Sequence, residues 1–323
     1  MNKEVVYEFF NNNSFFTFID ICNNFIYVTT NFPDKLIGGD YKIVNDEHLK
    51  NYCTSGCDNA LDKINAGCLY FFKEFFGSSD LFSQYAKNYM NIVEYIMIWL
   101  SYMLNLKNDA PGLTNLEHFY KIYIEGGNNY KQAIKNVTEY TNYKDLIDTK
   151  KYYLKMDKNI ISKLYNAFKL LCEMYTGFDT DKLNCTTSSE KAGKFVEIYE
   201  ELKKDLNITT NNSYNDVLCT LSADYDHFKN KFKNSKCSDT SFPEIKIPQN
   251  IIKCSEQKLK QISEDTSSSS SVTNKLLLVL SIFATIAIFL GIAYKYSLFG
   301  FRKRVQKQYL REKIKNIKKR MNH

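Results

Sequence analysis

The stretch DKNIISKLYNAFKLLCEMY, residues 157–175, decides the fold class of this 323-residue chain. Its apolar residues recur at spacings of three and four, which predicts a helix with one buried face. The residues on that face are Ile160, Ile161, Leu164, Phe168, Leu171 and Tyr175. Asp157 stands where an N-cap is expected, so that its carboxylate accepts hydrogen bonds from the first helical N–H groups.

The same periodicity runs through most of residues 40–240. ALDKINAGCLYFFKEFF, residues 60–76, is amphipathic, and Gly77 predicts its end. YIMIWLSYMLNL, residues 95–106, is too short to cross a bilayer and predicts a buried core helix. The chain has only four Pro and little strand-like alternation. We therefore expect an all-α, disulfide-containing helical ectodomain over residues 40–240, preceded by an N-terminal segment, residues 1–39.

Less regular stretches predict further helices. Thr187 and Glu190 fit a capping box at the start of a helix. The segment NDVLCTLSADYDHFKNKF, residues 215–232, repeats the amphipathic pattern. Shorter helices are predicted over residues 115–124 and 129–150.

One apolar run predicts a membrane span. LLLVLSIFATIAIFLGIAY, residues 276–294, carries no charge and lies between two lysines. As a helix it covers about 28 Å, close to the hydrocarbon thickness of a bilayer. We therefore predict one transmembrane helix, residues 275–295. The preceding residues 241–274 contain two Pro and the run SSSSS, which predicts a flexible Ser-rich stalk.

The distribution of charge orients this span. Residues 295–323 contain eleven Lys and Arg and one Glu, a net charge of +10, whereas the whole chain carries +7. Positive residues beside a span stay cytoplasmic, so we expect a cytoplasmic C-terminus and a lumenal or extracellular N-terminal domain. All nine Cys precede the span, which is consistent with an oxidising compartment on that side.

The basic tail, residues 296–323, predicts a short helix with an apolar stripe. Such a helix suits the anionic lipids of an inner leaflet. The expected membrane-surface contacts are Arg302, Lys303, Arg304, Lys307, Leu310, Arg311, Ile314 and Ile317. Nucleic acid is the other partner for such charge, but tethering to a membrane argues against it.

The cysteines have two interpretations. The disulfide candidates are Cys22, Cys53, Cys57, Cys68, Cys172, Cys185, Cys237 and Cys254. Bridges are expected within the Cys53, Cys57 and Cys68 group and between Cys172 and Cys185, whereas the helical pattern suggests a buried free thiol at Cys219. The alternative is a zinc site formed by His48 with Cys53, Cys57 and Cys68.

Motifs of common catalytic sites are missing from the sequence. It has four His and contains no P-loop, no paired-glycine nucleotide fingerprint, no GxSxG elbow and no metalloprotease pattern. We therefore expect neither enzymatic activity nor a bound cofactor or metal.

Several segments together resemble the PIR (Plasmodium interspersed repeat) variant antigens of rodent malaria parasites, the CIR/YIR/BIR type. They are MNKEV (1–5), LDKINAGCLYFFKEFFGSS (61–79), NIVEYIMIWLSYMLNLK (91–107), YKDLID (143–148), ISKLYNAFKLLCEMY (161–175) and YKYSLFGFRKRVQKQYLREKIKNIKKRMNH (294–323). The resemblance implies a single-pass membrane protein of the infected erythrocyte membrane or of the parasitophorous vacuole or parasite membrane. It also implies antigenic variation, host–parasite interaction and no enzymatic activity.

The beginning of the chain departs from that family pattern. Val6 stands where members commonly carry Cys, and Cys22 is a candidate replacement for the missing partner. Residues 7–30 are rich in Phe, Asn, Ile and Tyr, which AT-rich DNA tends to encode. One hypothesis is therefore that these residues are an atypical insertion that includes translated intron.

Two functions follow from topology and resemblance. The first is a variant surface or exported antigen whose ectodomain binds an unidentified host protein receptor or serves immune evasion. The alternative is a membrane scaffold or trafficking component in the infected host cell that acts through its basic tail.

Overall fold

The computed structural model describes residues 3–245, apart from 45–46, 55, 86–90, 110–113, 135–140, 179–183, 206–211, 234, 236 and 238–239. For residues 3–14 only the backbone is described. The chain divides into two units, Met1–Cys254 and Ser255–His323, and every described residue belongs to the first. The predicted transmembrane helix, the basic tail with its expected lipid contacts, and Cys254 therefore lie outside the described residues. Among the described helices none is long and apolar enough to cross a membrane.

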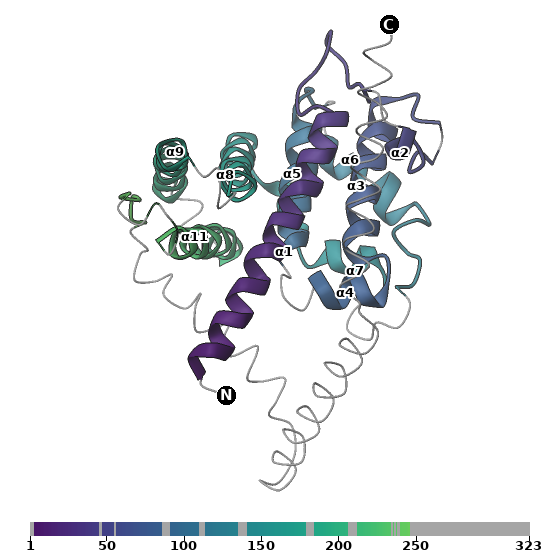
Figure 1. The fold of residues 1–323 in the computed structure, drawn as a ribbon. Helices are drawn as coiled ribbons and strands as arrows, with labels where there is room; N and C mark the ends of the chain where they lie inside the picture. Colours follow the sequence, from purple (N-terminus) through teal and green to yellow (C-terminus); the bar gives the residue numbers. More distant parts are fainter. Residues whose placement is uncertain are drawn as a thin grey trace, which may run out of the picture. The chain divides into compact units, whose positions relative to one another are not determined.

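The described part of the chain is helical, and its β-structure is limited to two isolated bridges. The predicted all-α class is therefore confirmed for this part (Figure 1). The elements are α1 Lys3–Asn31, α2 Glu47–Lys50, α3 Ala60–Phe76, α4 Ser79–Tyr85, α5 Ile92–Asn105, α6 Asn115–Phe119, the π-helix η1 Tyr120–Glu125, α7 Tyr143–Asp148, the 3-10 helix η2 Lys151–Lys155, α8 Lys158–Thr176, α9 Cys185–Lys204 and α11 Asn212–Lys233.

Helix α8 forms as its sequence predicts and lies at the centre of the packing. The carboxylate of Asp157 accepts from the N–H groups of Asn159 and Ile160, and Gly177 caps the other end. Its buried face includes all six predicted apolar residues, and the helix packs against α1, α5, α9 and α11. The amphipathic stripe thus becomes a surface onto which four other helices fold.

Helix α1, which lies in the predicted N-terminal segment 1–39, belongs to the same compact unit as the other described helices. From Phe15 onward one side of it is part of the core, and it packs against α8 and α11 (Figure 1). Its buried residues are Phe15, Phe18, Ile21, Cys22, Phe25 and Val28. The second half of the unusual segment 7–30 therefore carries core residues of the helical domain.

Helices α3 and α5 pack together through one close approach. A Cβ added to Gly67 of α3 would lie only 2.6 Å from the ring of Trp99 on α5. Trp99 is fully buried, as is most of the circumference of α5. This agrees with the prediction that residues 95–106 form a core helix.

Two local predictions are wrong. The helix expected from Thr187 begins instead at Cys185, because the side chain of Asn184 accepts from the Thr187 N–H and acts as the cap. Residues 129–150 do not form one helix. Ala133 and Asn142 form an isolated bridge, and Asn142 then caps the short helix α7. In both places an Asn side chain sets the start of the helix.

The segment that follows α11, residues 241–245, packs on the domain. Phe242 is buried against Phe228 and Phe232 of α11. The Tyr225 hydroxyl donates to the Pro243 carbonyl at 2.8 Å, and Glu244 pairs with Lys229. Residues 241–245, the start of the expected stalk, thus cover one face of α11.

Candidate binding surface

Three disulfides join described residues. They are Cys22–Cys172, Cys53–Cys57 and Cys185–Cys237, with sequence separations of 150, 4 and 52. The predicted Cys172–Cys185 pair is therefore wrong. Cys172 lies on the face of α8 that meets α1, whereas Cys185 begins α9 and meets the chain after α11. Helix orientation, rather than distance along the sequence, decides these partners.

The bridge predicted within the Cys53, Cys57 and Cys68 group forms between Cys53 and Cys57, whereas three other cysteine predictions are wrong. Cys68 is a buried free thiol inside α3, and its burial raises the pKa of that thiol to about 12. Cys219, expected to be a free thiol, is disulfide-bonded. The alternative zinc site with His48 does not form, because Cys53 and Cys57 are joined to each other. Within the described residues, no cluster of His, Cys, Asp or Glu could hold a metal.

A buried carboxylate ties α5 to η2. Glu94 is 1% exposed, forms an ion pair with Lys150 and accepts from the hydroxyls of Tyr152 and Tyr153, the latter at 2.7 Å. Burial and the nearby Glu94 carboxylate raise the pKa of Tyr153 well above its usual value, which keeps this phenol protonated as a donor. The negative charge of Glu94 is paired with the positive charge of Lys150, and both tyrosine hydroxyls have an acceptor. This arrangement is suited to holding α5 and η2 together.

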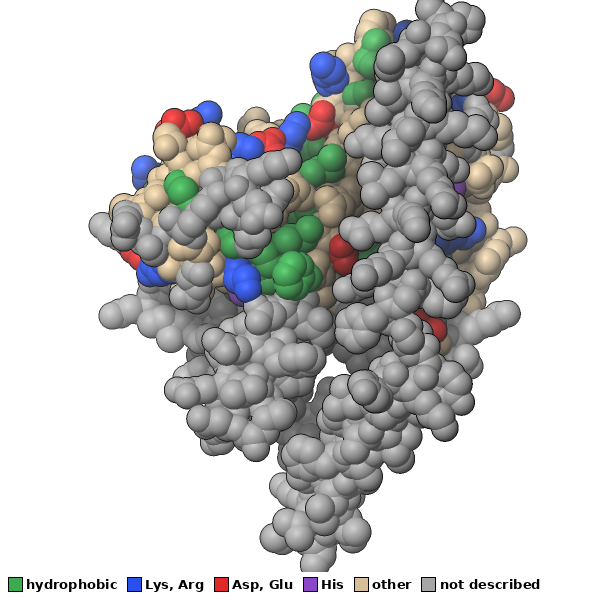
Figure 2. All heavy atoms as spheres, in the orientation of Figure 1, with side chains coloured by type: hydrophobic (Ala, Val, Ile, Leu, Met, Phe, Trp, Pro, Cys, Tyr) green, Lys and Arg blue, Asp and Glu red, His purple; other side chains and the backbone are tan. Residues whose placement is uncertain are grey.

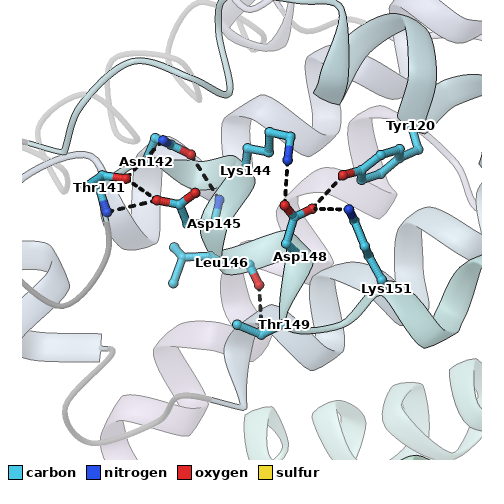
Figure 3. Close-up of polar contacts among 9 residues, drawn as sticks. All are labelled: Tyr120, Thr141, Asn142, Lys144, Asp145, Leu146, Asp148, Thr149 and Lys151. Atoms are coloured by element: carbon cyan, nitrogen blue, oxygen red, sulfur yellow. Dashed lines mark hydrogen bonds and ion pairs between the residues drawn. The ribbon is translucent and has the colours of Figure 1, made fainter.

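A second polar cluster holds α7 against η1 (Figure 3). Asp148 accepts from Tyr120 at 2.6 Å, and lies 2.5 Å from the Nζ of Lys144 and 3.3 Å from that of Lys151. Burial by itself would raise the pKa of Asp148, but Lys144 and Tyr120 lower it below its usual value. Both lysines point toward the Asp148 carboxylate, so the cluster stabilises the packing of α7 against η1.

An aromatic cluster at the surface has a different character. Tyr27 of α1, His48 of α2, Tyr52 after α2 and Tyr70 of α3 form what we call the His48 cluster. Ring centroids lie 5.7 Å apart for His48 and Tyr52, 5.8 Å for His48 and Tyr70, and 5.3 Å for Tyr27 and Tyr70. His48 is exposed, whereas Tyr70 is buried. The cluster is therefore a supported patch of rings with an accessible centre.

Hydrogen bonds fix the rings of the His48 cluster. The Tyr70 hydroxyl donates to Asn24 Oδ1 at 2.8 Å, and the Tyr52 hydroxyl donates to Glu74 at 3.3 Å. Lys73 lies above the Tyr52 ring, 5.3 Å from its centroid. Because the side chains are already ordered, binding a partner through them costs little conformational entropy.

The outer side of α1 continues this surface with apolar residues. Phe16 is 59% exposed and Ile26 is 38% exposed, whereas Ile122 of η1 is the third large apolar side chain exposed among the described residues, at 49%. We call the exposed side of α1, from Phe16 to Tyr27, the α1 face. Figure 2 shows apolar side chains gathered over the region that α1 occupies in Figure 1.

Sequence reasoning missed this surface and considered His48 only as a zinc ligand. Its residues come from three elements separated by loops, so no fixed spacing in the sequence predicts that they lie together. The one available signal is that apolar residues, Phe16 and Ile26 among them, lie on more than one side of this helix.

The comparisons with known proteins concern most of the chain. A family profile described as Plasmodium variant antigen protein Cir/Yir/Bir matches residues 22–295. A solved structure described as a Plasmodium PIR protein ectodomain has 28% sequence identity and a TM-score of 0.55, covering 73% of this chain and 98% of that chain. The search of curated proteins found no significant match. The chain therefore belongs to the Plasmodium Cir/Yir/Bir variant antigen family.

Proposed function

We propose that this variant antigen is a single-pass membrane protein whose ectodomain binds a host protein through the α1 face and the His48 cluster. The observation that carries the proposal is the ordered, accessible ring cluster beside exposed apolar residues on α1. Tyrosines that are rigidly held and flanked by apolar side chains resemble the residues that dominate protein–protein binding energies. The proposed anchor is the apolar run 276–294, which lies within the range matched by the family profile.

Topology is tested with antibodies raised against residues 40–240. Unpermeabilised infected erythrocytes should be labelled, since the proposal places the ectodomain outside the cell. Labelling that appears only after permeabilisation would contradict surface exposure and favour the alternative of an internal scaffold. In that alternative, deletion of residues 302–323 should abolish the phenotype, while changes on the α1 face do little.

The surface is tested by cell adhesion. Cells that display the full chain should lose most of their binding to host cells when Tyr52→Ala and Ile26→Ser are combined, because a few central residues carry most of the affinity of an interface. Ile122→Ser is the matched control, since this side chain is similarly exposed but lies on η1. Equal loss in the control, or no loss in the double variant, would refute the surface.

A further inference from the structure

We propose that the Cys53–Cys57 disulfide is a site of thiol–disulfide exchange, opened by small soluble thiols at concentrations that leave the other two described disulfides intact. The motif is CTSGC, residues 53–57, in the loop between α2 and α3. This reactivity goes beyond host binding and does not depend on it.

The first observation is accessibility. Cys53 is partly exposed in a loop. By contrast, Cys22 is fully buried and Cys172 is 3% exposed. In the third pair, Cys185 is partly exposed, as Cys53 is, and Cys237 is 2% exposed. A thiolate must approach a sulfur directly in order to attack it, so access limits the exchange rate. Cys53 offers such an approach and the Cys22–Cys172 pair does not, whereas backbone strain and loop size distinguish Cys53–Cys57 from Cys185–Cys237.

The second observation is the backbone of the loop. Cys57 has a φ of +59°, and among the described residues it is the one non-glycine residue with positive φ. Gly56, directly before it, has a φ of +87°. A side chain in this region is strained, and strained residues persist where other interactions hold them. The disulfide is one such interaction, so opening it releases strain and favours the reduced form.

The third observation is the size of the closed loop. Cys53 and Cys57 are separated by 4 residues, against 52 and 150 for the other two pairs. A cross-link restricts the unfolded chain less when its loop is short. Reduction of Cys53–Cys57 therefore costs the folded protein the least stability of the three, and the domain should remain folded while this bond opens.

The chemical step uses two equivalents of a soluble thiol, RSH. The thiolate RS⁻ attacks the Sγ of Cys53, an R–S–Sγ bond forms, the Sγ–Sγ bond breaks and Cys57 leaves as a thiolate that takes a proton from water. A second RS⁻ attacks the R sulfur, which releases Cys53 as a thiolate and gives RSSR. The protein disulfide gains two electrons, and two thiols are oxidised.

Opening the bond has a structural consequence that can be located. The Cys57 Sγ lies 3.7 Å from the carbonyl oxygen of Asp62, and Asn59 caps α3 two residues later. Tyr52 of the His48 cluster directly precedes Cys53. The exchange site therefore lies within the backbone that leads from α2 into α3.

The test is differential alkylation of the full chain in membranes. Samples are equilibrated with graded reduced glutathione, quenched, labelled with N-ethylmaleimide and mapped by mass spectrometry. Cys53 and Cys57 should reach half labelling at a thiol concentration about tenfold below that for Cys185 and Cys237, and further below that for Cys22 and Cys172. Buried Cys68 reports on folding, since it should stay unlabelled throughout. Opening of Cys185–Cys237 first, or of all three together, would overturn the proposal.

A matched pair of variants tests the role of the backbone. Gly56→Ala places a side chain at φ +87° and only 3.2 Å from Asp58 Oδ2, so it should lower the midpoint for Cys53 and Cys57 by about tenfold. Gly193→Ala is the control, because a Cβ there meets nothing within 4 Å. Equal midpoints in the two variants would show that backbone strain does not drive the exchange.

Discussion

The Cys22–Cys172 and Cys53–Cys57 bonds are chemically identical but lie in opposite settings. The first crosses between α1 and α8 in the core, whereas the second closes a loop at the surface. Around the first, Phe25 packs against Phe168 with ring centroids 4.7 Å apart. The second is flanked along the chain by Tyr52 of the His48 cluster and by the polar residues Asp58 and Asn59. One region of the helical domain is built for stability, and the other presents side chains to solvent.

The two regions should differ most in the free energy of unfolding that is lost when their disulfide is removed. Replacing Cys22 and Cys172 together by Ser should lower the free energy of unfolding by about 5 kcal/mol, because the closed loop is long. Replacing Cys53 and Cys57 by Ser should cost about 2 kcal/mol or less. Urea denaturation of the two double variants measures both values. Similar losses would mean that loop length and burial do not distinguish the two bonds.

Loss of a buried ion pair should cost more stability than loss of an exposed one. Glu94→Ala leaves Lys150 and two tyrosine hydroxyls without their partner in the interior and should cost about 4 kcal/mol. Lys163→Ala removes the exposed pair between α8 and Glu201 of α9, and should cost less than about 1 kcal/mol. Thermal and chemical unfolding of both variants checks the prediction, which fails if the exposed pair is the more costly to lose.

Replacing a helical glycine by alanine should change the stability of the domain in opposite directions at two positions. Gly67→Ala places a methyl group against the buried Trp99 ring, and should destabilise the domain by about 2 kcal/mol. Gly193→Ala in α9 meets nothing and should stabilise it by about 0.5–1 kcal/mol, because alanine has the higher helix propensity. Unfolding midpoints give both signs. A neutral Gly67→Ala would show that α3 and α5 can move apart.

A local effect on stability is expected at the start of α6. Thr114 and Glu117 form a capping box, and Thr114→Ala should cost about 1 kcal/mol. Hydrogen bonds from the backbone N–H and the hydroxyl of Thr114 lower the pKa of Glu117, so this contribution is present above the usual carboxyl pKa and is lost as pH falls through the lowered value. Stability measured between pH 7 and pH 3 should show the difference between wild type and variant narrowing on the acid side.

Features with a local cause were predictable from the sequence. Asp157 and Gly77 mark helix ends through contacts within a few residues, and the buried face of α8 follows from its own spacing. The partner of Cys172 was not predictable, because it depends on how α8 is oriented against α1. The His48 cluster was missed for the same reason, since α1, α2 and α3 contribute to it separately.

The order in which the chain is synthesised gives the Cys53–Cys57 bond a role during folding. Cys22 emerges 150 residues before Cys172, and during that interval Cys53 and Cys57 are the first thiols that could capture it wrongly. Short loops close fastest, within about 100 ns for ten residues, so Cys53 and Cys57 meet each other before either meets Cys22. The Cys53–Cys57 bond, which contributes least to the stability of the folded domain, thus keeps its two thiols from reacting with Cys22. Cys22 stays available for the Cys22–Cys172 bond, which contributes most.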